Sequence, residues 1–392
     1  MRKTITIGDL GTIITGKTPP TTNKNYYGDY AVFIKPTDIS EQSKYTYETE
    51  EMYSKLAAEK YESSLIPKGA ICVPCIGTIG TKMTMAPCDC YTNQSINSIV
   101  CNENYDNEYV YYLIKNFLPG LKAYNLGTAS GREYVSKSNF EKIELVAEQD
   151  KAIQKKIGVL LSRYDSLIEN YQKQIKLLEE AAQRLYKEWF VDLHFPGHEN
   201  TKIVNGVPEG WEKKKLVDMV DVQYGYAFDG KLFNSNSEGM PILRIRNIPD
   251  GITSDYTTEE AQDCYIVHNG DIVVGMDGIF HINSWSGGDA YLVQRACSFR
   301  PKEECMKGFI FQAIQEPIKF FEKTLVGATV AHLGKKHIDS IELCVPKNFA
   351  LYQTFSKFYN QRQGLLSQIR LLTEARDRLL PKLMSGEINV ES

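Results

Sequence analysis

Residues 175–185, IKLLEEAAQRL, return almost unchanged as residues 369–379, IRLLTEARDRL. Each copy lies in a stretch whose apolar residues recur at alternating steps of four and three, the heptad pattern of a coiled-coil seam. In the first stretch the seam residues are Ile157, Leu161, Tyr164, Ile168, Tyr171, Ile175, Leu178, Ala182, Leu185 and Trp189. An offset of 194 residues gives a second seam, seven of whose nine residues are apolar: Leu351, Phe355, Phe358, Arg362, Leu365, Ile369, Leu372, Arg376 and Leu379.

The sequence therefore predicts two long helices of matching length, and we expect Pro381 to end the second. Equal length and related sequence favour antiparallel pairing of the two helices within one chain. Two alternatives remain open: each helix packs on its own globular domain, or the helices mediate dimerisation.

The segments between the helices repeat more faintly. Residues 34–39, IKPTDI, align with residues 243–248, LRIRNI, and Gly16, Gly77 and Gln94 align with Gly225, Gly278 and Gln294. Short β-rich runs such as 31–34, 70–73, 242–245 and 271–274 read as strands. The predicted fold class is α+β, with two similar globular domains that have irregular β-sheets and two long antiparallel coiled-coil helices, in approximate two-fold symmetry. The expected boundaries are 1–150, 151–190, 191–348 and 349–392.

Composition describes an ordinary globular protein of 392 residues with a net charge of −4. The globular segments are acidic on average, whereas the helical segments 151–190 and 346–392 each carry a net charge of +3. A nucleic-acid surface would therefore have to be local. The chain has nine cysteines. We see no export signal and no apolar run long enough to span a membrane, so we expect a cytoplasmic protein whose thiols are reduced.

Two local motifs suggest chemistry that their surroundings disfavour. Residues 11–18, GTIITGKT, match the P-loop pattern, but Pro19 and Pro20 follow where the phosphate-binding helix should begin. Cys72 and Cys75 have zinc-ligand spacing, yet they align with Val273 and Met276, so we expect buried thiols and no metal site. We find no methyltransferase, metallohydrolase or serine-hydrolase signature, which favours a binding protein over an enzyme.

Basic, aromatic and amide side chains recur at matching places in the two halves. Arginine and lysine can contact phosphates or guanine, and glutamine can read adenine. The candidate DNA-binding residues are Lys17, Lys35, Lys82, Gln94, Arg132, Tyr134, Lys137, Tyr224, Tyr226, Arg244, Arg246, His281, Gln294, Arg295, Lys335 and Lys336. The competing interpretation is that most of these are solvated surface charges.

The whole chain resembles the specificity subunit of Type I restriction–modification systems. The resemblance rests on motifs in this order: residues 11–18 with the prolines that follow, 77–80 (GTIG), 93–97 (NQSIN), 187–192 (KEWFVD), 208–211 (PEGW) and 380–388 (LPKLMSGEI). The second copy departs from the first at residues 278–281, GIFH.

The resemblance implies a non-catalytic subunit with two target-recognition domains that read a bipartite double-stranded DNA site. It implies docking of two modification subunits, which hold S-adenosylmethionine and methylate adenine, and possible restriction subunits that use ATP and magnesium. No cofactor is expected in this chain. The predicted docking residues on the helices are Lys173, Lys176, Arg184, Trp189 and Phe190.

The helices would then act as a ruler between two half-sites. From Ile157 to Trp189 a helix spans roughly 50 Å at ~1.5 Å per residue, or about 15 base pairs of DNA. Two other functions remain alternatives: a coiled-coil scaffold that does not read DNA, and a nucleotide-dependent DNA enzyme that uses residues 11–18.

Overall fold

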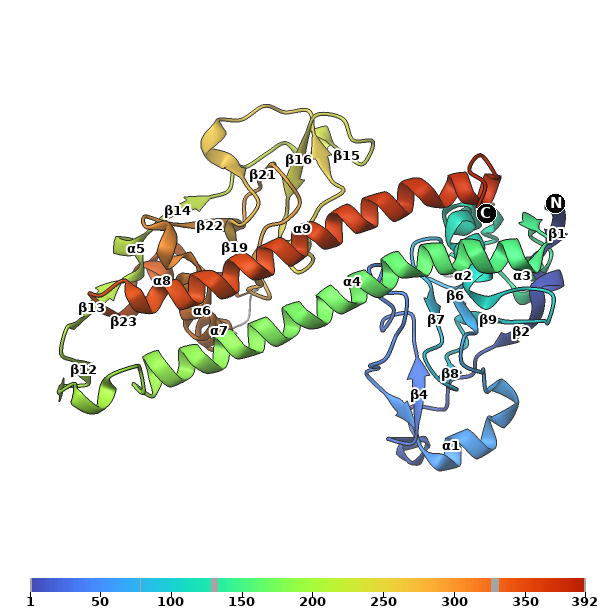
Figure 1. Ribbon diagram of the computed structural model, residues 1–392, viewed down its shortest axis with the longest axis horizontal. Coiled ribbons are helices and arrows are strands. Elements are labelled where there is room, and N and C mark those ends of the chain that lie inside the picture. Colours follow the sequence, from blue (N-terminus) through green and yellow to red (C-terminus); the bar gives the residue numbers. More distant parts are fainter. Residues whose placement is uncertain (1, 78, 128–132, 326–330, 391–392) are drawn as a thin grey trace. The chain divides into compact units, whose positions relative to one another are not determined.

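A computed structural model describes residues 2–77, 79–127, 133–325 and 331–390 (Figure 1). The chain forms two compact units that each take part of both long helices. Unit 1 contains Met1–Asn170 and Arg370–Ser392, and unit 2 contains Tyr171–Ile369. The units therefore cut across the expected boundaries at 150 and 348, and that four-part division stays a prediction.

In the residues that the structure describes, the globular part of unit 1 contains three small sheets and three short α-helices. Strands β1 (Arg2–Thr6) and β10 (Glu144–Glu148) pair antiparallel. A four-stranded sheet has the order β2 (Gly11–Thr15), β9 (Ile96–Cys101), β6 (Ile71–Pro74) and β7 (Thr84–Met85). A second has the order β3 (Tyr27–Gly28), β5 (Met52–Tyr53), β4 (Ala31–Ile34) and β8 (Tyr91–Thr92). The helices are α1 (Lys55–Lys60), α2 (Asn107–Phe117) and α3 (Lys137–Glu141).

Unit 2 repeats this plan. Strands β13 (Trp211–Lys215) and β23 (Glu342–Pro346) correspond to the first pair. The sheet order β14 (Val220–Tyr224), β22 (Ala296–Pro301), β19 (Ile272–Gly275), β20 (Ile282–Ser284) corresponds to the first sheet. The order β15 (Phe233–Asn234), β17 (Tyr256–Thr257), β16 (Met240–Leu243), β21 (Ala290–Leu292) corresponds to the second, with β18 (Ile266–Val267) added. Unit 2 also has a hairpin of β11 (Ile203–Val204) and β12 (Val207–Pro208). Its α-helices, within the described part of the chain, are α5 (Leu216–Met219), α6 (Lys307–Ala313), α7 (Gln315–Thr324) and α8 (Lys335–Asp339).

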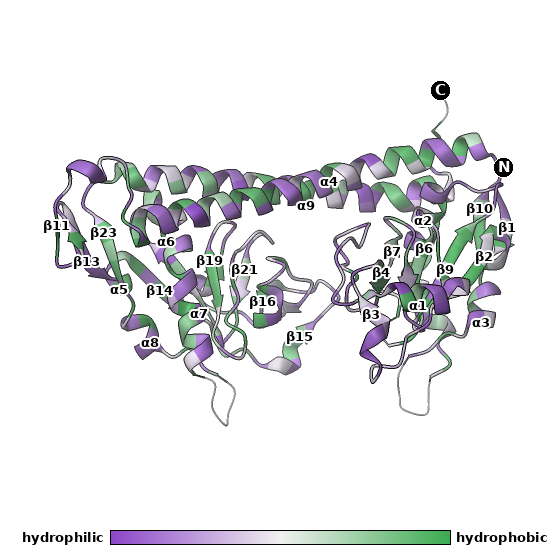
Figure 2. Ribbon diagram, turned by 90° about the horizontal axis from the view of Figure 1, so that it is seen from below, coloured by the Kyte–Doolittle hydropathy of each residue, from purple (hydrophilic) through white to green (hydrophobic). Residues whose placement is uncertain are grey.

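The two predicted helices are α4 (Lys151–Tyr186), which runs into a π-turn at Lys187–Val191, and α9 (Ala350–Ser385). Polar and apolar residues alternate along both (Figure 2). All of the seam residues predicted for the two helices are buried or half-buried. The α+β class and the heptad seams are confirmed. Among the described residues, no helix is both long and apolar enough to cross a membrane.

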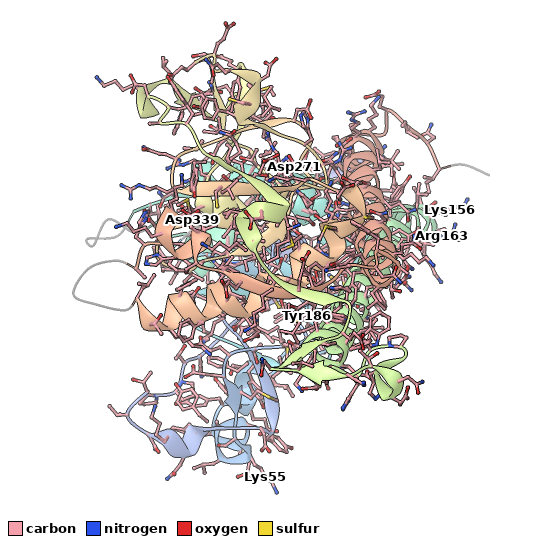
Figure 3. The ribbon with its side chains drawn as sticks, turned by 90° about the vertical axis from the view of Figure 1, so that its left-hand side faces the viewer. Lys55, Lys156, Arg163, Tyr186, Asp271 and Asp339 are labelled. Atoms are coloured by element: carbon pink, nitrogen blue, oxygen red, sulfur yellow. The ribbon has the colours of Figure 1, made fainter. Side chains whose placement is uncertain are left out.

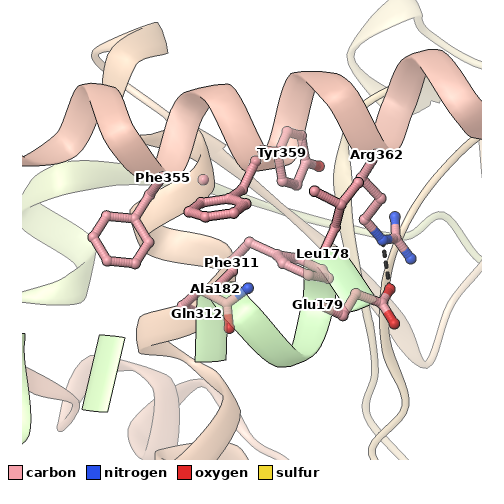
Figure 4. A pocket seen from close by; sticks show the side chains of 10 residues that line it. Leu178, Glu179, Ala182, Phe311, Gln312, Phe355, Tyr359 and Arg362 are labelled. Carbon is pink, nitrogen blue, oxygen red and sulfur yellow. Dashed lines mark hydrogen bonds and ion pairs between the residues drawn. The ribbon is translucent and has the colours of Figure 1, made fainter. Parts of the chain in front are cut away.

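The helix segments pair antiparallel within unit 2. Glu179 of α4 meets Arg362 of α9 (Nε to Oε1 2.5 Å), and one heptad later on α4, Tyr186 meets Phe355, one heptad earlier on α9. Figure 4 shows this junction, with Leu178 and Tyr359 beside the ion pair. The predicted antiparallel pairing within one chain is therefore confirmed.

Arg362 and Arg376, the two polar residues of the second seam, are buried where α9 packs against α4. Arg362 is 8% exposed and bonds to Glu179 as well as to Asn283 and Ser284 of the unit 2 domain. In unit 1, Arg376 pairs with Asp165 of α4, and both side chains are 7% exposed. Asp165 also accepts a hydrogen bond from Tyr112 of α2. Each arginine thus joins α9 to α4 in its own unit and connects the pair to the domain.

The prediction that Pro381 ends the second helix is wrong. The helix α9 continues through Pro381 to Ser385 and ends before Gly386, whose φ is +84°. Leu383 and Met384 in this last turn lie in the core of unit 1, so their burial outweighs the loss of one helical hydrogen bond at the proline. Arg2 donates to the carbonyls of the same two residues, which satisfies the helix end.

Candidate nucleic-acid interface

Three loops meet in each unit at the end of the four-stranded sheet. Loop A follows β6 or β19 (75–80 and 276–281), loop B precedes β9 or β22 (93–95 and 293–295), and loop C precedes α3 or α8 (133–136 and 331–334). Loop A of unit 1 is described apart from residue 78.

Backbone hydrogen bonds hold the three loops of unit 1 together. The Cys75 N–H donates to the Ser95 carbonyl at 2.7 Å, which joins loop A to loop B. The Gly77 N–H donates to the Glu133 carbonyl and the Val135 N–H to the Cys75 carbonyl, both at 2.9 Å, which joins loop A to loop C.

Unit 2 repeats the same three bonds at the corresponding positions. The Met276 N–H donates to the Arg295 carbonyl at 2.8 Å, and the Gly278 N–H to the Ala331 carbonyl at 3.0 Å. The Leu333 N–H donates to the Met276 carbonyl at 2.7 Å. The two units therefore share one backbone frame, on which the side chains differ.

A glycine brings a further strand end against loop B in both units. A Cβ on Gly16 would lie 2.1 Å from the Thr92 carbonyl oxygen, and one on Gly225 would lie 2.1 Å from that of Val293. Only glycine permits so close an approach. The residues that follow these glycines, Lys17 and Tyr226, are held there by N–H bonds to the carbonyls just before loop B.

The turns after β4 and β16 reach loop B from the other side. The Asn93 N–H donates to the Ile34 carbonyl at 3.0 Å, immediately before Lys35. The Val293 N–H bonds in the same way to the Leu243 carbonyl, immediately before Arg244.

The structure thus gathers about half of the predicted DNA-binding residues around the loops of their own unit. In unit 1 these are Lys17, Lys35, Gln94 and Tyr134, and in unit 2 they are Tyr226, Arg244, His281, Gln294 and Arg295. The glutamines and Arg295 are exposed. Lys35 is less available, because its ammonium pairs with Glu50 at 2.6 Å and Glu51 at 3.2 Å.

Three more predicted residues extend the frame, because α3 and α8 begin directly after loop C. Lys137, Lys335 and Lys336 occupy the first turns of these helices and are exposed.

Three predicted residues are not drawn into the frame. Arg246 is bound by Asp255 through both of its carboxylate oxygens. Tyr224 is half-buried in strand β14, and this burial raises the pKa of its hydroxyl to about 12. Lys82 is half-buried just before β7. Arg132 lies outside the described residues.

Asp277 and His332 belong to the frame but escaped the sequence interpretation. Asp277, in loop A, accepts a hydrogen bond from His332 Nδ1 of loop C at 2.5 Å and lies 3.2 Å from the guanidinium of Arg295 in loop B. The corresponding residues of unit 1 are Ile76 and Tyr134. The sequence signal that could have identified the pair is the presence of an aspartate and a histidine at these two positions in the second copy alone.

The helices carry the predicted docking surface. Lys173, Lys176 and Arg184 are exposed on α4, and Arg184 lies 3.8 Å from Glu180. Nearer the N-terminus of the same helix, in unit 1, Lys156 and Arg163 stand one heptad apart on the surface (Figure 3).

The two aromatic docking residues lie deeper. Phe190 is 7% exposed and packs against Trp211, Phe309 and Phe355, which leaves it little surface for a partner. Trp189 is half-buried with its ring against Phe355. Both side chains anchor the end of α4 to the core of unit 2. Of the five predicted docking residues, the exposed ones are Lys173, Lys176 and Arg184.

The two apparent motifs, residues 11–18 and the pair Cys72 and Cys75, have the local structures that their surroundings led us to expect. Residues 11–15 of the P-loop-like stretch are strand β2, paired with β9, and Gly16–Pro20 form a loop rather than a helix. Cys72 and Cys75 are buried as expected, and they belong to different core clusters. Burial raises the pKa of each thiol to about 12.

Two units with one loop frame and divergent side chains, each of which takes segments of both long helices, define a duplicated protein with two related loop surfaces. The sequence matches the family described as "Type I restriction modification DNA specificity domain" over residues 2–180 and 208–370, so the chain belongs to this family. It is a specificity subunit of the type I class, whose role is DNA recognition within restriction–modification complexes and which is generally non-catalytic.

Relatives share both sequence and fold with the chain. It is 26% identical to the Type I restriction enzyme MjaIX specificity subunit of Methanocaldococcus jannaschii, over 98% of this chain and 93% of that one. It is 35% identical to the HindI specificity subunit of Haemophilus influenzae, over 44% of this chain and 38% of that one. The crystal structure of the S subunit from M. genitalium superposes with a TM-score of 0.56 at 17% identity, covering 98% of this chain and 96% of that one.

Proposed function

We propose that the chain reads a bipartite DNA site, one half-site with the loops of each unit, and docks modification subunits on its helices. The observation that carries this proposal is the duplicated loop frame: the same three backbone bonds recur in both units beneath different side chains. A duplicated frame with divergent side chains suits a protein that reads two different short sequences.

Residues of the frame divide into two roles in this proposal. Lys17, Lys137, Lys335 and Lys336 contact phosphates and set the position of the duplex, because lysine is a mobile point charge. Gln94 and Gln294, exposed in loop B of their units, reach base edges, where glutamine can pair with adenine. The local basic groups offset the net charge of −4, which would otherwise oppose binding.

The basic face of α4 is the proposed contact for modification subunits that carry S-adenosylmethionine and methylate adenine. Two such subunits, with restriction subunits that use ATP and magnesium, would complete the assembly. Charge reversal at Lys173, Lys176 and Arg184 should abolish co-purification with a modification subunit. Reversal of Lys55, which is exposed on α1, is the matched control and should leave co-purification unchanged. Normal assembly of the triple variant would rule out this docking face.

DNA reading is tested on the complex of the chain with its modification subunits. Retention of duplexes should depend on sequence and fall steeply with salt, because each phosphate contact releases counterions. Mapping of methylated adenines in host DNA should give two half-sites at a fixed spacing. Assembly without sequence-dependent retention would support the alternative of a scaffold that does not read DNA.

A further inference from the structure

An aspartate, an arginine and a histidine of unit 2 meet where its loops A, B and C converge. Asp277 divides its two carboxylate oxygens between neighbours: Oδ1 accepts from His332 Nδ1 at 2.5 Å, and Oδ2 lies 3.2 Å from an Arg295 guanidinium nitrogen. Each residue comes from a different loop. The cluster therefore exists only because the loop frame brings the three loops together.

The same three positions carry no charge in unit 1. Asp277 and His332 form an isolated antiparallel bridge, and loop A and loop C of unit 1 form the same bridge. The correspondence is therefore one of backbone structure as well as sequence order. The residues at these positions in unit 1 are Ile76, Ser95 and Tyr134.

Stability does not account for the arrangement around Arg295. Its φ of +72° lies in the left-handed region that non-glycine residues rarely adopt, so the backbone there is strained. The side chain is 59% exposed, and an ion pair that open to solvent adds little to folding stability. The result of the arrangement is a guanidinium that is held at one end and faces outward from the loops.

We propose that this cluster reads a guanine in the half-site bound by unit 2, an inference that rests on the DNA-reading role proposed above. Arg295 donates from two N–H groups to guanine O6 and N7, the pairing that its forked geometry favours. Asp277 is a positioning residue that fixes the guanidinium, and His332 holds the second oxygen of Asp277.

The carboxylate argues for a base rather than a phosphate as the target. Asp277 would be repelled by a phosphate bound to its neighbour Arg295, which weakens a backbone contact at this point. In the major groove the same carboxylate can face the N4 amino group of the cytosine that pairs with the guanine, an attractive contact. Because Ile76, Ser95 and Tyr134 offer neither group, unit 1 is expected to read a different base at its own convergence point.

The test measures base preference with a library of duplexes in which one half-site at a time is randomised. The full chain is used in complex with its modification subunits, as wild type and as Arg295→Ala, Asp277→Asn and Lys319→Ala. Lys319 is an exposed residue of α7 that lies 3.9 Å from Glu316 and serves as the control. Arg295→Gly is included because glycine accepts the left-handed backbone, so loss of folding cannot hide the result.

Arg295→Ala and Arg295→Gly should lower the preference for guanine at one position of the unit 2 half-site by about 5- to 150-fold. Asp277→Asn should relax the same position to a smaller extent. The other half-site, the salt dependence of binding and the Lys319→Ala variant should match wild type, because a base contact releases no phosphate counterions.

Three other results would overturn the inference in distinguishable ways. Uniform weakening on all sequences, with the salt slope reduced by about one, would make Arg295 a phosphate contact and end the base-reading proposal alone. An unchanged half-site in the arginine variants would also end that proposal alone. Sequence-independent binding by the wild-type complex would end the proposed DNA-reading function itself.

Discussion

The buried pair of Asp165 and Arg376 offers a direct test of how the helices are joined in unit 1. Both side chains are 7% exposed, and the hydroxyl of Tyr112 donates to the same carboxylate. Replacing Arg376 by leucine leaves the Asp165 carboxylate buried without its ion-pair partner, and the Tyr112 hydroxyl still donates a hydrogen bond to it.

The expected cost follows from that burial. Removing one member of a buried ion pair costs about 3–5 kcal/mol, because the remaining charge has lost its partner without regaining water. A domain of the size of unit 1 shifts its Tm by roughly 2–4 °C per kcal/mol, so Arg376→Leu should lower the Tm of that unit by about 6–20 °C.

The double variant Asp165→Leu with Arg376→Leu separates charge burial from a general loss of contacts. It removes both charges and should recover about 2 kcal/mol of the loss, with a remaining deficit of about 1–3 kcal/mol from the unpaired Tyr112 hydroxyl. Differential scanning calorimetry of the full chain measures all variants.

The control is the surface pair of Arg370 and Glu374 on the same helix, which is 3.1 Å long and about 40% exposed. Glu374→Gln should cost no more than about 0.5 kcal/mol. A single variant as mild as this control, or a double variant less stable than the single, would refute the argument that the pair is a buried, mutually dependent unit.

Three further predictions concern spacing, thiols and pH. One heptad inserted after both Asn170 and Ile369 adds about 10 Å to each helix and should lengthen the spacer between methylated half-sites by about 3 base pairs; an unchanged spacer in methylation maps would contradict the ruler. Ellman's reagent should modify Cys88 and Cys264, which are exposed, in the native chain, whereas rapid reaction of any buried thiol would contradict the core assignment of Cys72, Cys75, Cys90 and Cys297. Burial raises the pKa of Tyr359 above the value of about 10 in the unfolded chain, so its contribution to stability is complete below about pH 10 and is lost as the pH rises toward the folded pKa. Urea midpoints should therefore fall above about pH 10, and less so in Tyr359→Phe; equal slopes for both proteins would exclude this residue as a cause.

Much of the architecture could be predicted from the sequence, because it depends on the periodicity of apolar residues. The heptad seams and their repeat predicted α4, α9 and their pairing, since a one-dimensional pattern is enough to define an apolar face. Strand β4 was predicted with its observed bounds, and Gly16 aligned with Gly225 because close backbone approach requires glycine at both.

Other features depend on contacts that a linear pattern does not contain. Arg362 and Arg376 look like defects in the second seam, and only the fold shows that each meets an acid on α4. Pro381 looks like a helix end because local propensity ignores the core that buries the next turn.

The recognition surface shows the same division. The sequence alone determined a duplicated α+β protein with two helices, and it pointed to Gln94, Gln294 and Arg295 by their alignment and residue type. Only the tertiary structure decided that Asp277 and His332 stand beside Arg295, because hydrogen bonds between loops distant in the chain bring them together. Periodicity fixes which residues share an element, whereas the convergence of separate elements fixes which side chains can act as one group.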